Sequence, residues 1–182
     1  WRVVGRENLL IKVPGTAAGI PAFEQLISEG INVNVTLLFS RAVYEQVALA
    51  YLAGLEKFAA QGGDLGRIAS VASFFVSRID TSVDSILKAR LEKPASPPEQ
   101  SQQSQLRRLL GKAAIANAKL AYQRYGEIFS GERWEALRAR GAQTQRILWA
   151  STSTKDPQYR DVIYVEELIG RLSVDLVVFA YS

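Results

Sequence analysis

The sequence predicts an α/β fold in which parallel strands form a sheet and helices pack outside it. Short apolar runs that are typical of strands alternate four times with segments in which apolar residues recur at helical spacing. Such alternation is typical of a parallel sheet. The 182 residues, 48% of them hydrophobic and 22% charged, suffice for one ordinary domain with a sizeable core. An eight-unit barrel of this class needs about 250 residues, so the chain supplies roughly half of one.

The first predicted strand, residues 9–13, is an apolar run that contains Lys12. Pro14 and Gly15 stop this strand, and Thr16 can cap the helix that follows. A primary amine at the end of a hydrophobic strand is costly unless it is paired or uncharged, and an uncharged amine can attack a carbonyl, as a Schiff-base lysine does. The alternative from these residues alone, and the commoner case, is a lysine that extends out to the solvent.

The second predicted strand, residues 31–39, begins with strict alternation. Its apolar face carries Val33, Val35 and Leu37, and its polar face carries Asn32, Asn34 and Thr36. A strand with one apolar face and one face of amides and hydroxyls is typical of a barrel interior that has one end open to water. We expect helices over residues 17–30 and 41–58 on either side of this strand.

The second half of the chain continues the alternation. Strands are expected over residues 68–76 and 146–151, and helices over residues 81–91, 106–125, 132–140 and 161–170. Residues 93–105, rich in Pro, Gln and Ser, are expected to form a loop insertion. The apolar residues 174–181 are a candidate for a further strand. The whole chain, residues 1–182, is expected to be one partial barrel domain.

Composition excludes several kinds of chemistry. With no cysteine and no histidine, disulfides, thiolate metal sites and histidine-dependent triads are excluded. A metal would need carboxylates alone, and no tight acidic cluster is present, so we expect no metal and no cofactor. No run of about 18 uncharged apolar residues predicts a membrane-spanning helix. Residues 1–7 lack the features of a secretory signal, so we expect a soluble, cytoplasmic protein.

The net charge is +4 and the isoelectric point about 9.4. A nucleic-acid-binding protein usually gathers its basic residues on one face. The densest positions here are Arg107, Arg108, Lys112, Arg138 and Arg140, and acidic residues are spread between most of them. We therefore expect a solvated helix surface and no binding to nucleic acid or membranes. Small anionic substrates such as sugar phosphates are compatible with the basic balance.

Several segments of the chain, in the same order, resemble transaldolase, a class I aldolase-type (β/α)8 TIM barrel. The segment Asn-Leu-Leu-Ile-Lys-Val-Pro-Gly-Thr at residues 8–16 is one of them, and the others are residues 30–40, 70–80, 117–122 and 142–152. The likeness runs from residue 1 to about residue 170. It implies that the chain holds about half of the barrel, the strands equivalent to 4 to 7.

Carried over position by position, the resemblance implies roles for individual residues. Lys12 would form the Schiff base with the ketose donor, and Thr36 would position the water that relays protons. Asn34 would form hydrogen bonds with the hydroxyls of the ketose donor beside the imine, Ser73 would contact the dihydroxyacetone end, and Arg78 would bind the substrate phosphate. The residues alone leave other roles open. The amide and the two hydroxyls also fit structural positions, and the arginine also fits a surface ion pair.

Two further positions, Arg146 and Ser151, lie where the family adds phosphate contacts. The implied activity is the transfer of a dihydroxyacetone unit from sedoheptulose 7-phosphate or fructose 6-phosphate to an aldose phosphate, in the non-oxidative pentose phosphate pathway. Simple aldol cleavage, which would use the same lysine and release free dihydroxyacetone, is a related alternative.

The family pattern also predicts what this sequence lacks. In the family the lysine lies on the fourth strand, and the aspartate that acts as general acid and base lies on the first. Lys12 follows only eleven residues, and residues 171–182 depart from the pattern, so we expect a truncated chain. The alternative to full activity is a catalytically weak or inactive fragment that folds only as an oligomer or with a complementary segment. The open sheet edges of a half-barrel favour a homo-oligomer. Some family members are fused to a phosphoglucose isomerase, which the sequence leaves open here.

Overall fold

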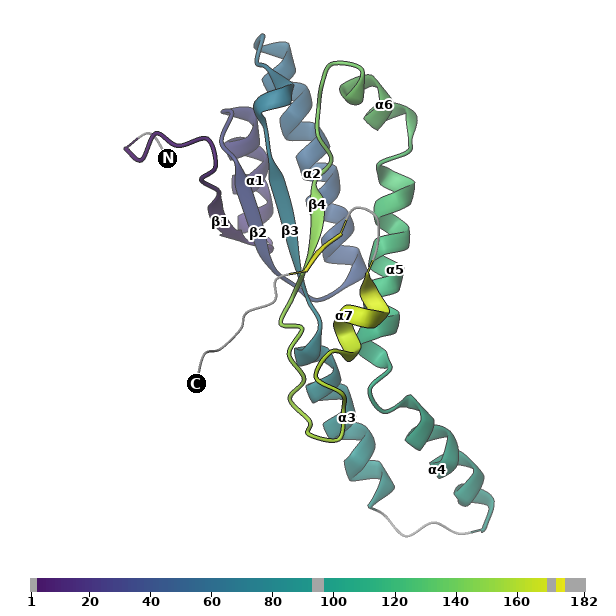
Figure 1. The fold of residues 1–182 in the computed structure, drawn as a ribbon. Coiled ribbons are helices and arrows are strands. Elements are labelled where there is room, and N and C mark those ends of the chain that lie inside the picture. The colour runs from purple at the N-terminus through teal and green to yellow at the C-terminus, as the bar shows by residue number, and fades with distance from the viewer. Residues whose placement is uncertain (1–2, 93–96, 170–172, 176–182) are drawn as a thin grey trace.

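The computed structural model of the chain describes residues 3–92, 97–169 and 173–175, and it contains one parallel sheet (Figure 1). The strands, in sheet order, are β1 (Ile11–Pro14), β2 (Val33–Leu38), β3 (Ser70–Phe75), β4 (Arg146–Ala150) and β5 (Ser173–Asp175). Every neighbouring pair is parallel, and sequence order equals spatial order. The predicted α/β class with a parallel sheet is therefore confirmed. The expected final strand is described only at 173–175, and residues 176–181 lie outside the described part.

Helices connect the strands. They are α1 (Gly19–Ser28), α2 (Arg41–Ala60), α3 (Ser77–Leu91), α4 (Pro97–Leu109), α5 (Ala113–Ile128), α6 (Glu132–Arg138) and α7 (Ile163–Leu168), with a 3-10 turn at Leu65–Arg67. Figure 1 shows α1 and α2 lying together against one side of the strands, with α5 alongside α2. Among the described residues, no helix is both long enough and apolar enough to cross a membrane.

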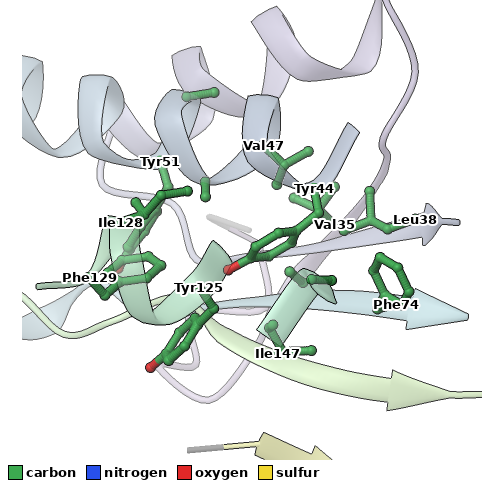
Figure 2. Packing of buried hydrophobic residues seen from close by; sticks show 14 of the residues in the cluster. Val35, Leu38, Tyr44, Val47, Tyr51, Phe74, Tyr125, Ile128, Phe129 and Ile147 are labelled. Carbon is green, nitrogen blue, oxygen red and sulfur yellow. The ribbon is translucent and has the colours of Figure 1, made fainter. Parts of the chain in front are cut away.

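The hydrophobic core lies between the sheet and these helices (Figure 2). Strands β1 to β4 send alternate side chains into it, and α2 and α5 supply aromatic rings. The residues labelled in Figure 2 are Val35, Leu38, Tyr44, Val47, Tyr51, Phe74, Tyr125, Ile128, Phe129 and Ile147. The other face of the sheet carries the remaining side chains of these strands, among them Lys12, Asn34 and Ser73.

The alternation of β2 breaks at Leu37. The sequence pattern predicts Leu37 on the apolar face, but its side chain is 43% exposed and its φ is 62°, in the left-handed region. The pairing with β3 shifts register between Val35 and Leu38, and Leu38 is fully buried instead. An extra residue at the end of the strand therefore moves the apolar position along by one, as a β-bulge does.

The region after α3 also differs from the sequence prediction. The expected loop insertion at 93–105 is wrong for residues 97–105, because these residues belong to α4; residues 93–96 lie outside the described part. The single helix expected over 106–125 is two helices, α4 and α5, with a break at Gly111. The φ of Gly111 is 68°, and a Cβ atom there would lie 2.9 Å from the Tyr159 ring. The left-handed turn and the close approach of Tyr159 both require glycine and end α4.

Candidate active site

Lys12, Asn34, Val71 and Arg146 lie in one register row across β1 to β4. Lys12 pairs with Asn34, Asn34 with Val71, and Val71 with Arg146. Paired residues of neighbouring parallel strands project to the same face. The face that they share is opposite the core, because Ile11, Val33 and the other alternate positions project toward the helices. The structure thus places Lys12 and Asn34 side by side on this face.

The amine of Lys12 is accessible. Its side chain is exposed, which fits the alternative of a lysine that extends out to the solvent. The reason is that helices pack on one face of β1 only, and Lys12 projects from the other. Among the residues that the structure describes, no carboxylate forms an ion pair with Lys12, so its amine can meet a ligand.

Ser73 orients the amide of Asn34. The Ser73 hydroxyl donates a hydrogen bond of 2.7 Å to Oδ1 of Asn34, and the Ser73 side chain is buried. With Oδ1 engaged, the N–H groups of the same amide are the donors that Asn34 can offer to a ligand. The two residues come from adjacent strands, so the sheet itself sets their separation. Asn34 and Ser73 thus form a neutral, hydrogen-bonded pair beside Lys12.

Thr36 lies one step further along the same face of β2. It pairs with Pro14 in the sheet, two residues beyond the pairing of Lys12 with Asn34, and it is buried. Its carbonyl accepts a hydrogen bond of 2.8 Å from the Gly15 N–H. The end of β1 and the end of β2 are therefore locked together, and the Thr36 hydroxyl is held on the side of the sheet that carries Lys12.

Arg78 lies in the first turn of α3, directly after β3. Its guanidinium carbon is 4.8 Å from the centre of the Phe75 ring, a cation–π contact. The Phe75 ring in turn contacts the Phe39 ring, with centres 5.2 Å apart. Arg78 is exposed, so its charged end is available while its direction is restrained by the ring beneath it. Composition and spacing gave no indication of this role for Phe75.

Ser151 lies beside the start of the same helix. The hydroxyls of Ser151 and Ser77 are 2.8 Å apart, and the Ser77 N–H donates to the Ser151 carbonyl at 3.0 Å. The φ of Ser151 is 57°, a conformation that non-glycine residues seldom adopt and that concentrates at functional sites. The structure therefore gathers Ser151 and Arg78 near the carboxyl ends of β3 and β4.

Arg146 does not join that group. It is the first residue of β4, four residues before Ala150, whose carbonyl accepts the Val76 N–H at the other end of the strand. At about 3.3 Å per residue, Arg146 and Ala150 are about 13 Å apart along the strand. Arg146 and Ser151 thus lie at opposite ends of β4. This placement argues against the predicted phosphate contact of Arg146 alongside Arg78.

A buried polar cluster follows Arg78 on α3, and the sequence pattern did not indicate it. The carboxylates of Asp80 and Asp84, one turn apart on α3, accept hydrogen bonds from the Tyr164 and Tyr159 hydroxyls at 2.8 and 2.7 Å. Burial first, and the hydrogen bond to the carboxylate second, raise the pKa of each tyrosine well above its ordinary value. The spacing of the two aspartates on one helix face was a visible signal, but their partners lie 75 and 84 residues away.

A cleft of about 560 Å³ opens beside this cluster, between α3 and the segment after β4. Its lining includes Lys88 and Asp156, which form an ion pair with each other. Lys12 does not line this cleft, and Lys88 and Asp156 in it are already paired with each other. We therefore place the candidate active site on the sheet face around Lys12 and at the start of α3.

Comparison with known proteins gives a consistent result. The family model described as Transaldolase/Fructose-6-phosphate aldolase matches residues 1–175. The chain is 54% identical to "Transaldolase" of Trichodesmium erythraeum over 96% of its length and 45% of the relative's. It is 56% identical to "Transaldolase 2" of Nostoc punctiforme over 97% and 46%, and 51% identical to "Transaldolase" of Mycolicibacterium smegmatis over 96% and 44%. The chain thus spans somewhat less than half the length of the curated relatives it matches. Its parallel α/β sheet is consistent with part of a (β/α)8 barrel, and the chain belongs to the transaldolase/fructose-6-phosphate aldolase family.

Proposed function

We propose that the chain carries the imine-forming centre of an enzyme that transfers a dihydroxyacetone unit between sugar phosphates. The donor is a ketose phosphate, fructose 6-phosphate or sedoheptulose 7-phosphate, and the acceptor is an aldose phosphate. The observation that carries the proposal is the register row that sets Lys12 beside Asn34 on the helix-free face of the sheet. The names of the relatives support the same activity.

The proposed chemistry begins with the amine of Lys12. Its nitrogen adds to the carbonyl carbon C2 of the donor, water leaves, and a protonated imine forms. The imine accepts the electron pair of the C3–C4 bond as that bond breaks. The C4 aldehyde leaves, and a three-carbon enamine stays on Lys12. The enamine then attacks the carbonyl carbon of the acceptor aldehyde, and water hydrolyses the new imine to release the product.

Neutral groups beside Lys12 fit the uncharged part of the donor. The N–H groups of Asn34 are oriented by the hydrogen bond from Ser73 and are available to the donor hydroxyls. The Thr36 hydroxyl, on the same face, is the group that we assign to the water that relays protons.

The phosphate group of the donor is assigned to the start of α3. Arg78 supplies a planar guanidinium whose N–H groups match two phosphate oxygens. Ser151, beside the first turn of that helix, adds a hydroxyl. We leave Arg146 out of this group because it begins β4, at the other end of the strand from Ser151.

The step that breaks the C3–C4 bond also needs a base for the C4 hydroxyl proton. Strands β1 to β4 contain no aspartate or glutamate. We therefore infer that Lys12 of this chain forms the imine readily and that cleavage is slow unless a carboxylate from outside the chain joins the site. The alternative is a fragment that is catalytically weak or inactive, or that folds only as an oligomer or with a complementary segment.

The test measures sedoheptulose 7-phosphate formed from fructose 6-phosphate and erythrose 4-phosphate. We expect slow transfer that Lys12→Met abolishes, while the control Lys57→Met, at an exposed lysine paired with Glu24, leaves it unchanged. Transfer that survives Lys12→Met contradicts the proposal. Free dihydroxyacetone released without an acceptor indicates aldol cleavage by the same lysine. No product in either assay indicates the inactive fragment.

The remaining proposals concern context. We propose that the reaction belongs to the non-oxidative pentose phosphate pathway and that it takes place in the cytoplasm. Its substrates are sugar phosphates. Association of the chain with a second copy through the open sheet edges and fusion of its parent to a phosphoglucose isomerase stay predictions. Sedimentation of the purified chain tests the first of these.

A further inference from the structure

The first turn of α3 carries both Arg78 and a buried carboxylate, Asp80. The Asp80 side chain is 2% exposed. One of its oxygens accepts the N–H of Ala114, at the start of α5, at 2.8 Å, and the other accepts the Tyr164 hydroxyl of α7 at 2.8 Å. A carboxylate withdrawn from water in this way needs its hydrogen bonds to offset the lost hydration. Both partners come from distant parts of the chain.

The next turn of α3 repeats the arrangement. Asp84 accepts the N–H of Gly111 at 3.1 and 3.2 Å and the Tyr159 hydroxyl at 2.7 Å. Figure 1 shows α3 continuing from β3 away from the sheet, with the segment that follows β4 running beside it. The two aspartates therefore join α3 to the start of α5 and to the segment that leads back to α7.

We propose that Asp80, with the Tyr164 hydroxyl, is a positioning residue that holds the first turn of α3 so that Arg78 faces the phosphate of a ketose phosphate donor; this inference rests on the proposed function. Asp80 touches no reacting atom. It acts through the backbone of its own turn, where Arg78 lies two residues before it and Ser77 three. Ser77 contacts Ser151, so the same turn also sets the position of that hydroxyl.

The chemistry of the cluster suits a fixed support. Burial and the hydrogen bond to Asp80 raise the pKa of Tyr164 well above its ordinary value. Tyr164 therefore keeps its proton and donates to Asp80 throughout the neutral range. The support does not depend on Lys12, Asn34 or Ser73, which lie on the sheet. Loss of the support is therefore expected to weaken phosphate recognition and to leave imine formation itself unchanged.

The test compares two donors in borohydride trapping on the 182-residue chain. Dihydroxyacetone reports on Lys12 and the neutral groups beside it, and fructose 6-phosphate reports on these groups and on the phosphate contacts. For Tyr164→Phe, we expect the concentration of fructose 6-phosphate that gives half-maximal trapping to rise about tenfold, the loss typical of one hydrogen bond to a charged group. The value for dihydroxyacetone is expected to stay within about twofold of the parent's. Asp80→Asn is expected to shift the same value in the same direction.

Tyr51→Phe is the matched control. Tyr51 is a buried tyrosine whose hydroxyl donates to the Gln143 carbonyl at 2.8 Å, outside the cluster on α3. This variant loses one buried hydroxyl and is expected to trap both donors as the parent does. Equal losses for both donors in Tyr164→Phe, or a rise with fructose 6-phosphate in Tyr51→Phe as large as in Tyr164→Phe, would overturn the proposal.

Hydrogen exchange separates this inference from the proposed function. We expect amide exchange over residues 77–81 to be faster in Tyr164→Phe than in Tyr51→Phe or the parent. If neither donor is trapped by the parent chain but this difference is found, the proposed function fails and the support of α3 by Asp80 stands. Unchanged exchange over these residues overturns the support itself.

Discussion

Gly54→Ala, a substitution at the contact of α1 with α2, should destabilise the chain. An alanine Cβ at this position would lie 2.7 and 2.8 Å from the Cβ and Cγ2 atoms of Ile27 and 2.9 Å from the Glu24 carbonyl oxygen. Favourable carbon contacts lie at about 3.5–4.0 Å. Ile27 is fully buried, so it cannot move out into solvent. The methyl group therefore has to push the two helices apart.

The expected magnitude is a difference of two terms. Inserting a methyl group into a well-packed contact costs about 1–3 kcal/mol. Alanine is a better helix former than glycine, which returns about 1 kcal/mol in a helix interior. The net expectation is a loss of up to about 2 kcal/mol in the free energy of unfolding. Because α1 contacts β1 and β2, the displacement of α1 also shifts the strands that carry Lys12 and Asn34.

Gly126→Ala, in the last turn of α5, is the matched control. An added Cβ at Gly126 meets no described atom within 4 Å, so only the gain in helix propensity remains. The free energy of unfolding is expected to rise by about 0.5–1 kcal/mol. Urea unfolding of the parent and both variants measures the two signs. A Gly54→Ala chain as stable as Gly126→Ala would refute the close packing of α1 on α2.

Three further predictions address the site and its surroundings. Ser73→Ala removes the hydrogen-bond donor to Oδ1 of Asn34. The rate of borohydride trapping with dihydroxyacetone is therefore expected to fall about fivefold, which is the effect of losing one ordinary hydrogen bond. An unchanged rate would contradict the proposed role of the Ser73–Asn34 pair. Arg78→Lys keeps the charge but loses the planar fork, so the half-saturating concentration of fructose 6-phosphate is expected to rise about tenfold while that of dihydroxyacetone is unchanged. Burial raises the pKa of Tyr51, so the folded chain retains a proton that the unfolded chain releases, and stability should fall as the pH rises above about 10. Urea unfolding at about pH 9 and about pH 11 should show this loss, and Tyr51→Phe should reduce it.

The sequence predicted the sheet because each strand has a local signal. The alternation from Asn32 to Thr36 placed Asn34 on the polar face, and the register with β1 then placed it beside Lys12. The β-bulge at Leu37 has no such signal in the sequence, because the residue types of β2 are the same whether or not its backbone forms a bulge. Similarly, the polar residues of α4 have the composition of a loop, and nothing apolar marks them as helical.

The strand residues of the candidate site could be proposed from the sequence, and their supports could not. The resemblance assigned roles to Lys12, Asn34 and Ser73, which stay predictions, and the sheet brings the three residues together. The Asp80–Tyr164 hydrogen bond joins residues 84 positions apart, and no local pattern links them. The strand pattern left the exposure of Lys12 open, because it depends on which face of the sheet the helices cover.

Borohydride trapping of the chain with dihydroxyacetone and with fructose 6-phosphate, followed by peptide mapping, shows directly whether Lys12 forms the imine. We expect one donor-derived adduct, located on Lys12, with each donor. The Lys12→Met chain should carry none, and the Lys57→Met chain should carry the same adduct as the parent. No adduct on Lys12, or an adduct that persists in Lys12→Met, would contradict the account.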